Sequence, residues 1–243
     1  LSSFPFGKGY KEKVLETLSN DFPTYRFQKN LGIHGYFIIH ATKFLTSSNG
    51  HLGFVTLRSW LDSKYGDALR DFILDHFQVL AIISSDERWF RDAQMIPCVI
   101  ILRVSEDPNG RDDNVVRFVH LRRRLTDFLP IDQDHETLYW SKLDAFVNRL
   151  LYVEKDFEIS EVEYIGRPIG VHEDETVKTV TLRQRYLRSE KKWSKFLVAP
   201  TLFFKVASRS AATTVPLDEI AAVRRGITTG ANDFFLFPNR YFS

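Results

Sequence analysis

The sequence predicts an α/β fold, and residues 50–104 carry that prediction. Three short apolar runs, residues 53–57, 79–83 and 98–104, have the length and composition of strands. A segment with helical spacing of its apolar residues, 66–77, separates the first two runs. Because very little sequence lies between these elements, we expect the helix to pack directly on a sheet.

Each of these elements follows from its own pattern. In segment 66–77, Leu69, Phe72 and Ile73 share one face while the other is charged, so these three side chains should point at the sheet. The later two strands are apolar throughout, as strands covered on both faces are. Residues 35–45, before the turn signal at 47–50, should form a helix that buries Phe37, Ile38, Ala41, Phe44 and Leu45.

The pattern changes in the second half of the chain. A strand is expected at residues 115–120 and a helix at 137–151. Alternation at 157–165 and 177–187 predicts antiparallel strands in a second unit, and 217–223 reads as a short helix or turn. We therefore expect a first domain at residues 1–125, a linker helix region at 126–155 and a second domain at 156–243.

Composition sets broad limits. The chain has 243 residues, one cysteine and a net charge of +2, without a signal-peptide pattern or an apolar run long enough for a membrane helix. Cys98 lies in an apolar strand, where a buried structural thiol is the simplest interpretation. These features favour a cytoplasmic protein. The histidines show no zinc-ligand spacing, so we expect no metal.

Two basic clusters stand out, at residues 117–124 and 183–195. Such clusters can neutralise nucleic-acid phosphates. The alternative is a solvated surface of mixed charge, because acidic segments at 154–163 and 173–175 lie between the clusters.

Four blocks in sequence resemble adenine-specific DNA methyltransferases of type II restriction–modification systems. They are the helix and strand at 35–61, YGDALRDFI at 65–73, RWFRDAQMIPCVIIL at 88–102 and VPLDEIAAVRRGITTGANDFFLF at 215–237. The resemblance implies part of a class I S-adenosylmethionine-dependent methyltransferase (Rossmann-like) sheet with a C-terminal β-hairpin. It also implies that an α+β DNA-recognition domain with its target-reading residues begins after it.

The resemblance also implies catalytic residues. The family's tetrad, a polar residue followed by Pro-Pro-aromatic, would fall on Ser3, Phe4, Pro5 and Phe6, where Phe4 departs from the pattern. Its polar group and a backbone carbonyl would accept hydrogen bonds from the adenine amino group, and Phe6 would stack on the base once it leaves the duplex. The alternative is an N-terminal segment whose two phenylalanines pack on the sheet.

The aromatic loop before residue 98 is the second candidate. Phe90 would form a wall of the base pocket, with Trp89 as a substitute and Arg88 and Arg91 contacting phosphates. The alternative is an aromatic anchor for the hairpin, with solvated arginines. In the recognition unit the candidates for DNA contact lie in one glycine-punctuated loop that could equally be a structural turn: Arg224, Arg225, Thr228, Thr229 and Asn232.

The family binds S-adenosylmethionine with a glycine-rich loop after its first strand, and no such loop precedes Gly35. We therefore expect a methyltransferase fragment that binds the cofactor weakly by itself. Its partners would be double-stranded DNA and a missing N-terminal half or a partner methylase chain. The alternatives are a non-catalytic DNA-binding or assembly module that completes such a partner, and an α/β interaction domain without a nucleic-acid role.

Overall fold

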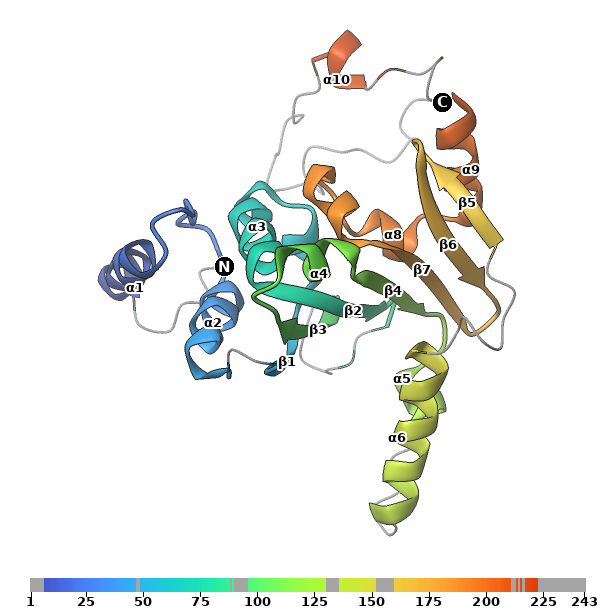
Figure 1. The fold of residues 1–243 in the computed structure, drawn as a ribbon, viewed down its shortest axis with the longest axis horizontal. Coiled ribbons are helices and arrows are strands. Elements are labelled where there is room, and N and C mark those ends of the chain that lie inside the picture. Colours follow the sequence, from blue (N-terminus) through green and yellow to red (C-terminus); the bar gives the residue numbers. More distant parts are fainter. Residues whose placement is uncertain are drawn as a thin grey trace, which may run out of the picture. The chain divides into compact units, whose positions relative to one another are not determined.

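The computed structural model describes residues 7–46, 49–87, 89, 96–129, 136–151, 160–210, 213, 215 and 217–222. The chain divides into two compact units, Leu1–Ser208 and Arg209–Ser243. Within the described part of the second unit, the regular element is the short helix α10 (Leu217–Ile220). The sheet and the core described below belong to the first unit (Figure 1).

One seven-stranded sheet organises the first unit, in the order β1-β3-β2-β4-β7-β6-β5. The α/β class is thereby confirmed. The strands are β1 (His51–Leu57), β2 (Phe77–Ser85), β3 (Pro97–Val104), β4 (Val115–Leu121), β5 (Ser160–Tyr164), β6 (Arg167–Glu173) and β7 (Val177–Arg183).

Strand direction places several strand ends together. β3 runs antiparallel to both of its neighbours, β1 and β2, while β2 and β4 are parallel. It follows that β1, β2 and β4 all point the same way and that their carboxyl ends lie at one edge of the sheet. In open α/β sheets this is the edge at which ligands bind. β1 pairs with β3 alone among the described strands, so its outer side is a sheet edge.

The strands expected in a second unit belong to the same sheet as β1 to β4. β7, which we expected in a separate unit, pairs with β4 from Val115↔Arg183 to Leu121↔Val177. The alternating pattern misled because the polar residues of β7 are buried too: Lys178 and Thr179 are 2% and 1% exposed. β7 is therefore an interior strand of the same sheet.

The main core lies on one face of this sheet. Ile82, Phe118 and Val180 face it in register, and helix α3 (Asp67–His76) lies against β2. As expected, Leu69, Phe72 and Ile73 of α3 are fully buried. Helix α8 (Lys195–Val198) covers β4 through Phe196, whose ring centroid is 5.1 Å from that of Phe118. Helix α9 (Thr201–Ser210) adds the buried side chain of Phe204 to this core.

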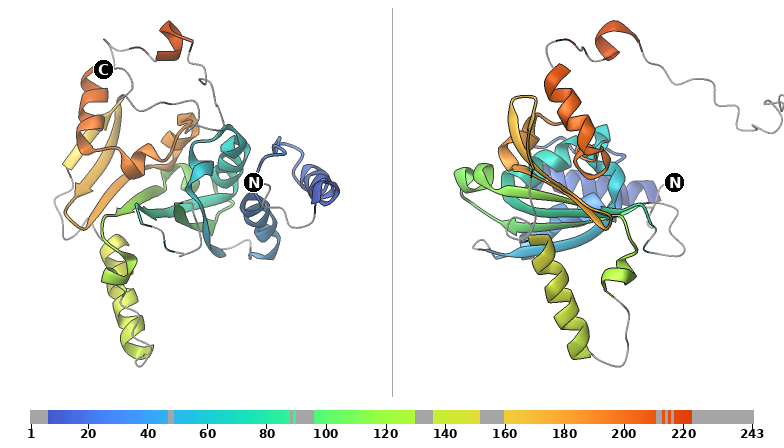
Figure 2. Two further views of the ribbon diagram at one scale, coloured as in Figure 1. Left: turned by 180° about the vertical axis from the view of Figure 1, so that it is seen from behind. Right: turned by 90° about the vertical axis from the view of Figure 1, so that its right-hand side faces the viewer.

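The other face carries a smaller cluster near the carboxyl end of β4. Val119, Leu121 and Val177 are buried there against helices α5 (Leu125–Phe128) and α6 (Glu136–Leu151). These two helices meet through Phe128 and Phe146, with ring centroids 5.2 Å apart. Figure 2 shows both helices at this end of the sheet.

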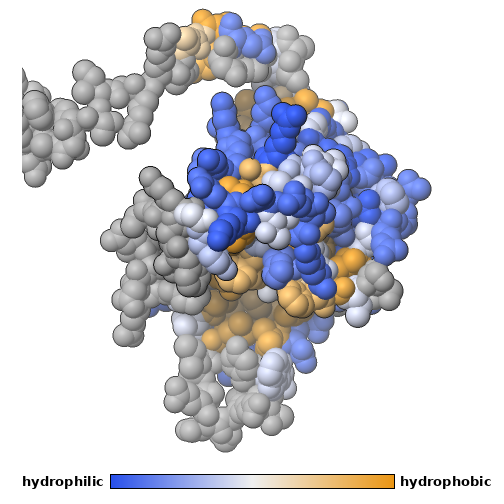
Figure 3. All heavy atoms as spheres, turned by 90° about the vertical axis from the view of Figure 1, so that its left-hand side faces the viewer, coloured by the Kyte–Doolittle hydropathy of each residue, from blue (hydrophilic) through white to orange (hydrophobic). Residues whose placement is uncertain are grey.

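Helix α2 (Ile33–Ala41) and the 3-10 turn that follows it (Thr42–Phe44) correct the burial expected for residues 35–45. Ile38 is buried as expected, but Phe37 and Phe44 are 54% and 77% exposed. Tyr36 and Ile39 are buried instead. Because α2 is apolar around most of its circumference, residue spacing could not indicate which side meets the core. Figure 3 shows hydrophobic residues among hydrophilic ones on the side that carries α2 and α1 (Gly7–Asp21).

Strand β7 ends earlier than expected and continues as a 3-10 turn, η4 (Gln184–Ser189). The buried Gln184 amide explains the change, because it serves an irregularity in β2 between Val79 and Ala81. Its Oε1 accepts from the Val79 N–H at 2.9 Å, and its Nε2 donates to the Phe77 carbonyl at 2.8 Å.

Helix α4 (Pro108–Asp113) precedes β4. None of the described helices has the length and apolarity needed to cross a membrane.

Candidate functional site

A row of polar side chains crosses the sheet next to the carboxyl ends of β1, β2 and β4. The strand register places its members opposite one another on the face that carries the main core. From β1 to β6 these residues, which we call the polar row, are Thr56, Cys98, Ser84, His120, Lys178 and Glu173.

The β1 side of the polar row is buried. The Ser84 hydroxyl donates to the Pro97 carbonyl at 2.9 Å. Cys98 is fully buried, and burial raises the pKa of its thiol to about 12, so it stays protonated and unreactive at neutral pH. Thr56 Oγ1 and Nη1 of Arg58, which follows β1, have no hydrogen-bond partner among the described residues.

The centre of the row is a histidine–aspartate pair. His120 Nε2 lies 3.2 Å from Asp86 Oδ2, and the His120 side chain is 7% exposed. Burial lowers the pKa of His120, against the opposing effect of Asp86, so the imidazole is neutral at neutral pH. Its Nδ1 has no partner among the residues described. This neutral imidazole is available to accept or donate one further hydrogen bond.

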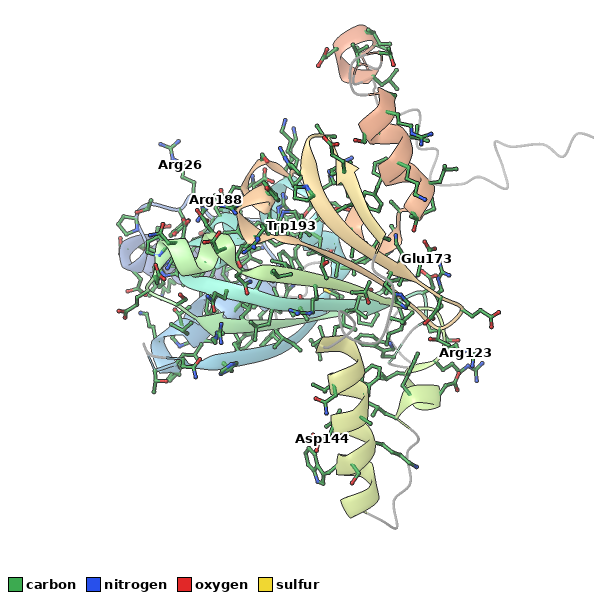
Figure 4. All side chains as sticks on the ribbon, turned by 45° about the vertical axis from the view of Figure 1, so that its right-hand side comes forward. Arg26, Arg123, Asp144, Glu173, Arg188 and Trp193 are labelled. Carbon is green, nitrogen blue, oxygen red and sulfur yellow. The ribbon has the colours of Figure 1, made fainter. Side chains whose placement is uncertain are left out.

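At its β6 end, the polar row consists of two charged residues, Lys178 and Glu173. Lys178 Nζ donates to the Ala199 carbonyl and lies 5.3 Å from the ring centroid of Phe204. Glu173, labelled in Figure 4, accepts hydrogen bonds from Thr201 and Arg122. Burial raises the pKa of Glu173, but these two contacts outweigh it and the net shift is downward. The carboxylate therefore stays ionised.

Because Lys178 is buried, we expect the free energy of unfolding to depend on pH. Burial lowers its pKa from 10.5 to about 8. Between these values the native protein has released this proton while the unfolded chain still holds it, so stability rises with pH. At 1.36 kcal/mol per pH unit, the rise between about pH 8 and 9.5 is about 2 kcal/mol.

Urea unfolding of the wild type and of Lys178→Met at several pH values in this window measures the effect. The wild type should gain stability relative to the variant as the pH rises. A difference between the two proteins that does not change with pH would contradict a lowered lysine pKa.

The basic clusters divide into paired and unpaired residues. In the first cluster, Arg122, Arg123 and Arg124 lie within 4.0 Å of the carboxylates of Glu173, Glu175 and Glu87. In the second, four residues have acidic partners: Arg183, Arg185, Arg188 and Lys195. For these residues the mixed-charge interpretation is favoured over phosphate binding.

Trp89, in the predicted aromatic loop, is the one described residue among 88–95. It is partly buried and packs on the cluster of Val119, Leu121 and Val177. This contact favours the anchor interpretation for Trp89 over a pocket wall.

The remaining candidates lie outside the described residues, and their predicted roles stay predictions. They are the catalytic candidates Ser3, Pro5, Phe6 and Phe90, the loop arginines Arg88 and Arg91, and Arg224, Arg225, Thr228, Thr229 and Asn232 of the recognition loop.

Sequence reasoning missed the polar row. A signal was present, because Thr56, Ser84 and His120 each stand at or near the end of an apolar run. Their meeting depends on strand order, which places β3 between β1 and β2 and pairs β4 with β7.

The crowded glycines among the described residues are enclosed by the protein's own atoms. Where an added Cβ would be crowded, it would meet the protein itself: the Trp60 carbonyl at Gly66 and the Leu31 side chain at Gly35. Gly166 has a positive φ of 71° but serves the β5–β6 turn. Within the described ranges, no three His, Cys, Asp or Glu residues are grouped so as to hold a metal ion.

The first part of the chain is similar to one known protein family. Residues 6–90 match the family model described as Eco57I restriction-modification methylase. The match runs from α1 through β2 and the start of its following loop, and covers less than half of the 243 residues. This part is therefore similar to restriction–modification methylases. No curated protein sequence matches the chain.

Two solved structures are similar at a distance. The type IIG restriction endonuclease BpuSI has 11% identity and a TM-score of 0.49, over 76% of this chain and 18% of that one. A structure from a type I restriction–modification system has 15% identity and a TM-score of 0.40, over 78% of this chain and 35% of that one. The chain thus spans less than two thirds of either relative.

Proposed function

We propose that the chain is part of a DNA methyltransferase of a restriction–modification system. The observation that carries this proposal is the match of residues 6–90 to a restriction–modification methylase family. The matched segment includes two of the three strands whose carboxyl ends meet at one edge, β1 and β2. It also includes the start of the loop that holds the candidate pocket residue Phe90.

The proposed reaction transfers a methyl group from S-adenosylmethionine to the amino group of adenine in DNA. The target adenine must leave the duplex, so a pocket is needed beside the strand ends. Phe90 follows β2 by five residues and is close in sequence to that edge. In this proposal Ser3 and Pro5 contact the amino group, and Phe6 and Phe90 hold the base. The cofactor cradle is supplied by sequence other than the described residues.

The remaining assignments belong to the same proposal. Residues 1–125 form the closing half of the catalytic domain, while strands β5–β7 extend its sheet. Target recognition is assigned to the loop that holds Arg224, Arg225 and Asn232, whose side chains suit guanine and adenine. Arg88 and Arg91 contact phosphates beside the pocket. The proposed location is the cytoplasm.

The product base tests this proposal. DNA from cells that express the intact protein should contain N6-methyladenine, measured by mass spectrometry of its nucleosides. DNA from cells with an empty vector is the control. Methylcytosine in place of methyladenine would refute adenine specificity, and unmethylated DNA would refute the proposed activity.

A second candidate is a non-catalytic module that completes a partner methylase chain. The outer side of β1 favours it, because β1 has no strand partner there among the described residues and an edge strand offers unpaired N–H and C=O groups to another strand. Calorimetry with S-adenosylmethionine separates the candidates. An assembly module should show cofactor binding only after its partner is added, whereas an intact single-chain enzyme should bind without one. Micromolar binding by residues 1–243 alone would overturn the expectation of weak binding.

A further inference from the structure

The second basic cluster contains two exposed lysines, Lys191 and Lys192, that differ from their neighbours. They lie on residues 190–194, the segment between η4 and α8, which we call the basic strap. Both side chains are exposed, and neither has an acidic partner within 4.0 Å among the described residues. The other basic residues of this cluster are in ion pairs, so these two lysines carry its unneutralised charge.

The backbone of the basic strap is held in place by buried contacts. Trp193, labelled in Figure 4, is fully buried and meets Trp60 edge to face, with ring centroids 6.1 Å apart. Its backbone N–H donates to the Leu61 carbonyl at 3.0 Å. The strap is thereby attached to the turn that follows β1.

Polar contacts fix both sides of the lysine pair. The buried guanidinium of Arg70 donates to the Lys191 carbonyl at 3.1 Å. On the other side, the Ser194 N–H donates to Asp62 Oδ1 at 3.0 Å, and the Ser194 hydroxyl donates to Oδ2 of the same carboxylate. Since the two lysine Cα positions are fixed, a partner that binds them does not have to order this backbone, which lowers the entropic cost of binding.

The strap borders a shallow groove. This groove of about 580 Å3 is bordered by Lys191, Lys192 and Lys195 on the strap side and by Val198 and Phe203 on the helix side. Within it, Lys195 is bound to the Glu190 carboxylate, so the free charge lies at Lys191 and Lys192. Two lysine charges on a fixed backbone suit a partner that carries several phosphates, such as a nucleic-acid strand, because each lysine can neutralise one of them.

We propose that the basic strap contacts the sugar–phosphate backbone of double-stranded DNA through Lys191 and Lys192. This inference rests on the proposed function and adds a positioning surface to it. Contacts of this kind set the orientation of the duplex and carry no sequence information. The strap therefore strengthens binding to specific and nonspecific DNA alike.

The salt dependence of binding tests the proposal. The full chain and Lys191→Gln/Lys192→Gln are titrated into fluorescent duplex DNA at several salt concentrations, for two unrelated duplex sequences. Each phosphate contact contributes about 0.9 to the slope of log K against log salt, so the slope should become shallower by about 1.8. The loss should be equal for both sequences. Thermal unfolding verifies that the variant is folded.

The matched control removes the same charge away from the strap. Lys13→Gln/Lys205→Gln replaces two exposed lysines, on α1 and α9, that also have no acidic partner among the described ion pairs. Its slope should equal that of the wild type. Salt-dependent binding by the wild type with an unchanged slope in the strap variant would overturn this inference alone. Binding of neither duplex by the wild type would overturn the proposed function together with it.

Discussion

Replacing Trp193 with alanine is expected to lower the free energy of unfolding by about 3 to 5 kcal/mol, the range for deleting a large buried aromatic side chain. Trp193 is fully buried, and its indole N–H donates to the Glu190 carbonyl at 3.1 Å. Its ring packs against Trp60 from the turn after β1. The substitution would remove this contact between segments far apart in the sequence and leave a cavity in the main core.

Urea unfolding followed by circular dichroism measures this effect. Trp140→Ala is the matched control, because Trp140 on α6 is 54% exposed and the same number of atoms is removed. The control should lose less than about 1 kcal/mol, as surface substitutions do. Equal losses in the two variants would contradict the packing described around Trp193.

The second large effect is expected at Phe90 in the intact protein. If this ring stacks on the extruded adenine, Phe90→Ala removes about 1 to 3 kcal/mol of base stacking. At 1.36 kcal/mol per tenfold change in rate, methyl transfer should fall roughly 5- to 150-fold. The motivation is the position of Phe90 just after the carboxyl end of β2, together with the methylase match that ends at this residue.

The control for Phe90 keeps the ring. Phe90→Tyr retains a stacking surface and should preserve most of the activity, whereas a role as packing anchor would show as lost stability in Phe90→Ala. Turnover by Phe90→Ala equal to that of the wild type, measured with saturating cofactor, would remove Phe90 from the site.

Local patterns predicted much of the first half of the fold. Strands at 53–57, 79–83, 98–104 and 115–120 correspond to β1 through β4, and the helix at 66–77 corresponds to α3. These elements were predictable because each has a regular period and sits between clear turn signals. The burial of Leu69, Phe72 and Ile73 also followed from spacing, whereas Arg70 on the charged face of α3 is buried and donates to backbone carbonyls.

The contacts between residues far apart in the sequence could not be predicted from local patterns. The alternation in 177–187 indicated a strand with a polar side, but β7 lies between β4 and β6, where Lys178 and Thr181 are buried. The Trp60–Trp193 contact and the Gln184 bridge to β2 join residues more than a hundred positions apart. Neither residue spacing nor composition indicates contacts between residues so far apart in the sequence. The polar row could not be predicted for the same reason, because it depends on the strand order.

Transfer of a labelled methyl group tests the account most directly. Purified intact protein is incubated with duplex DNA and S-adenosylmethionine labelled on its methyl group, and the label in the DNA is counted. The account predicts label on adenine, lost when either DNA or protein is omitted. DNA that stays unlabelled while the folded protein binds both the cofactor and the duplex would contradict it.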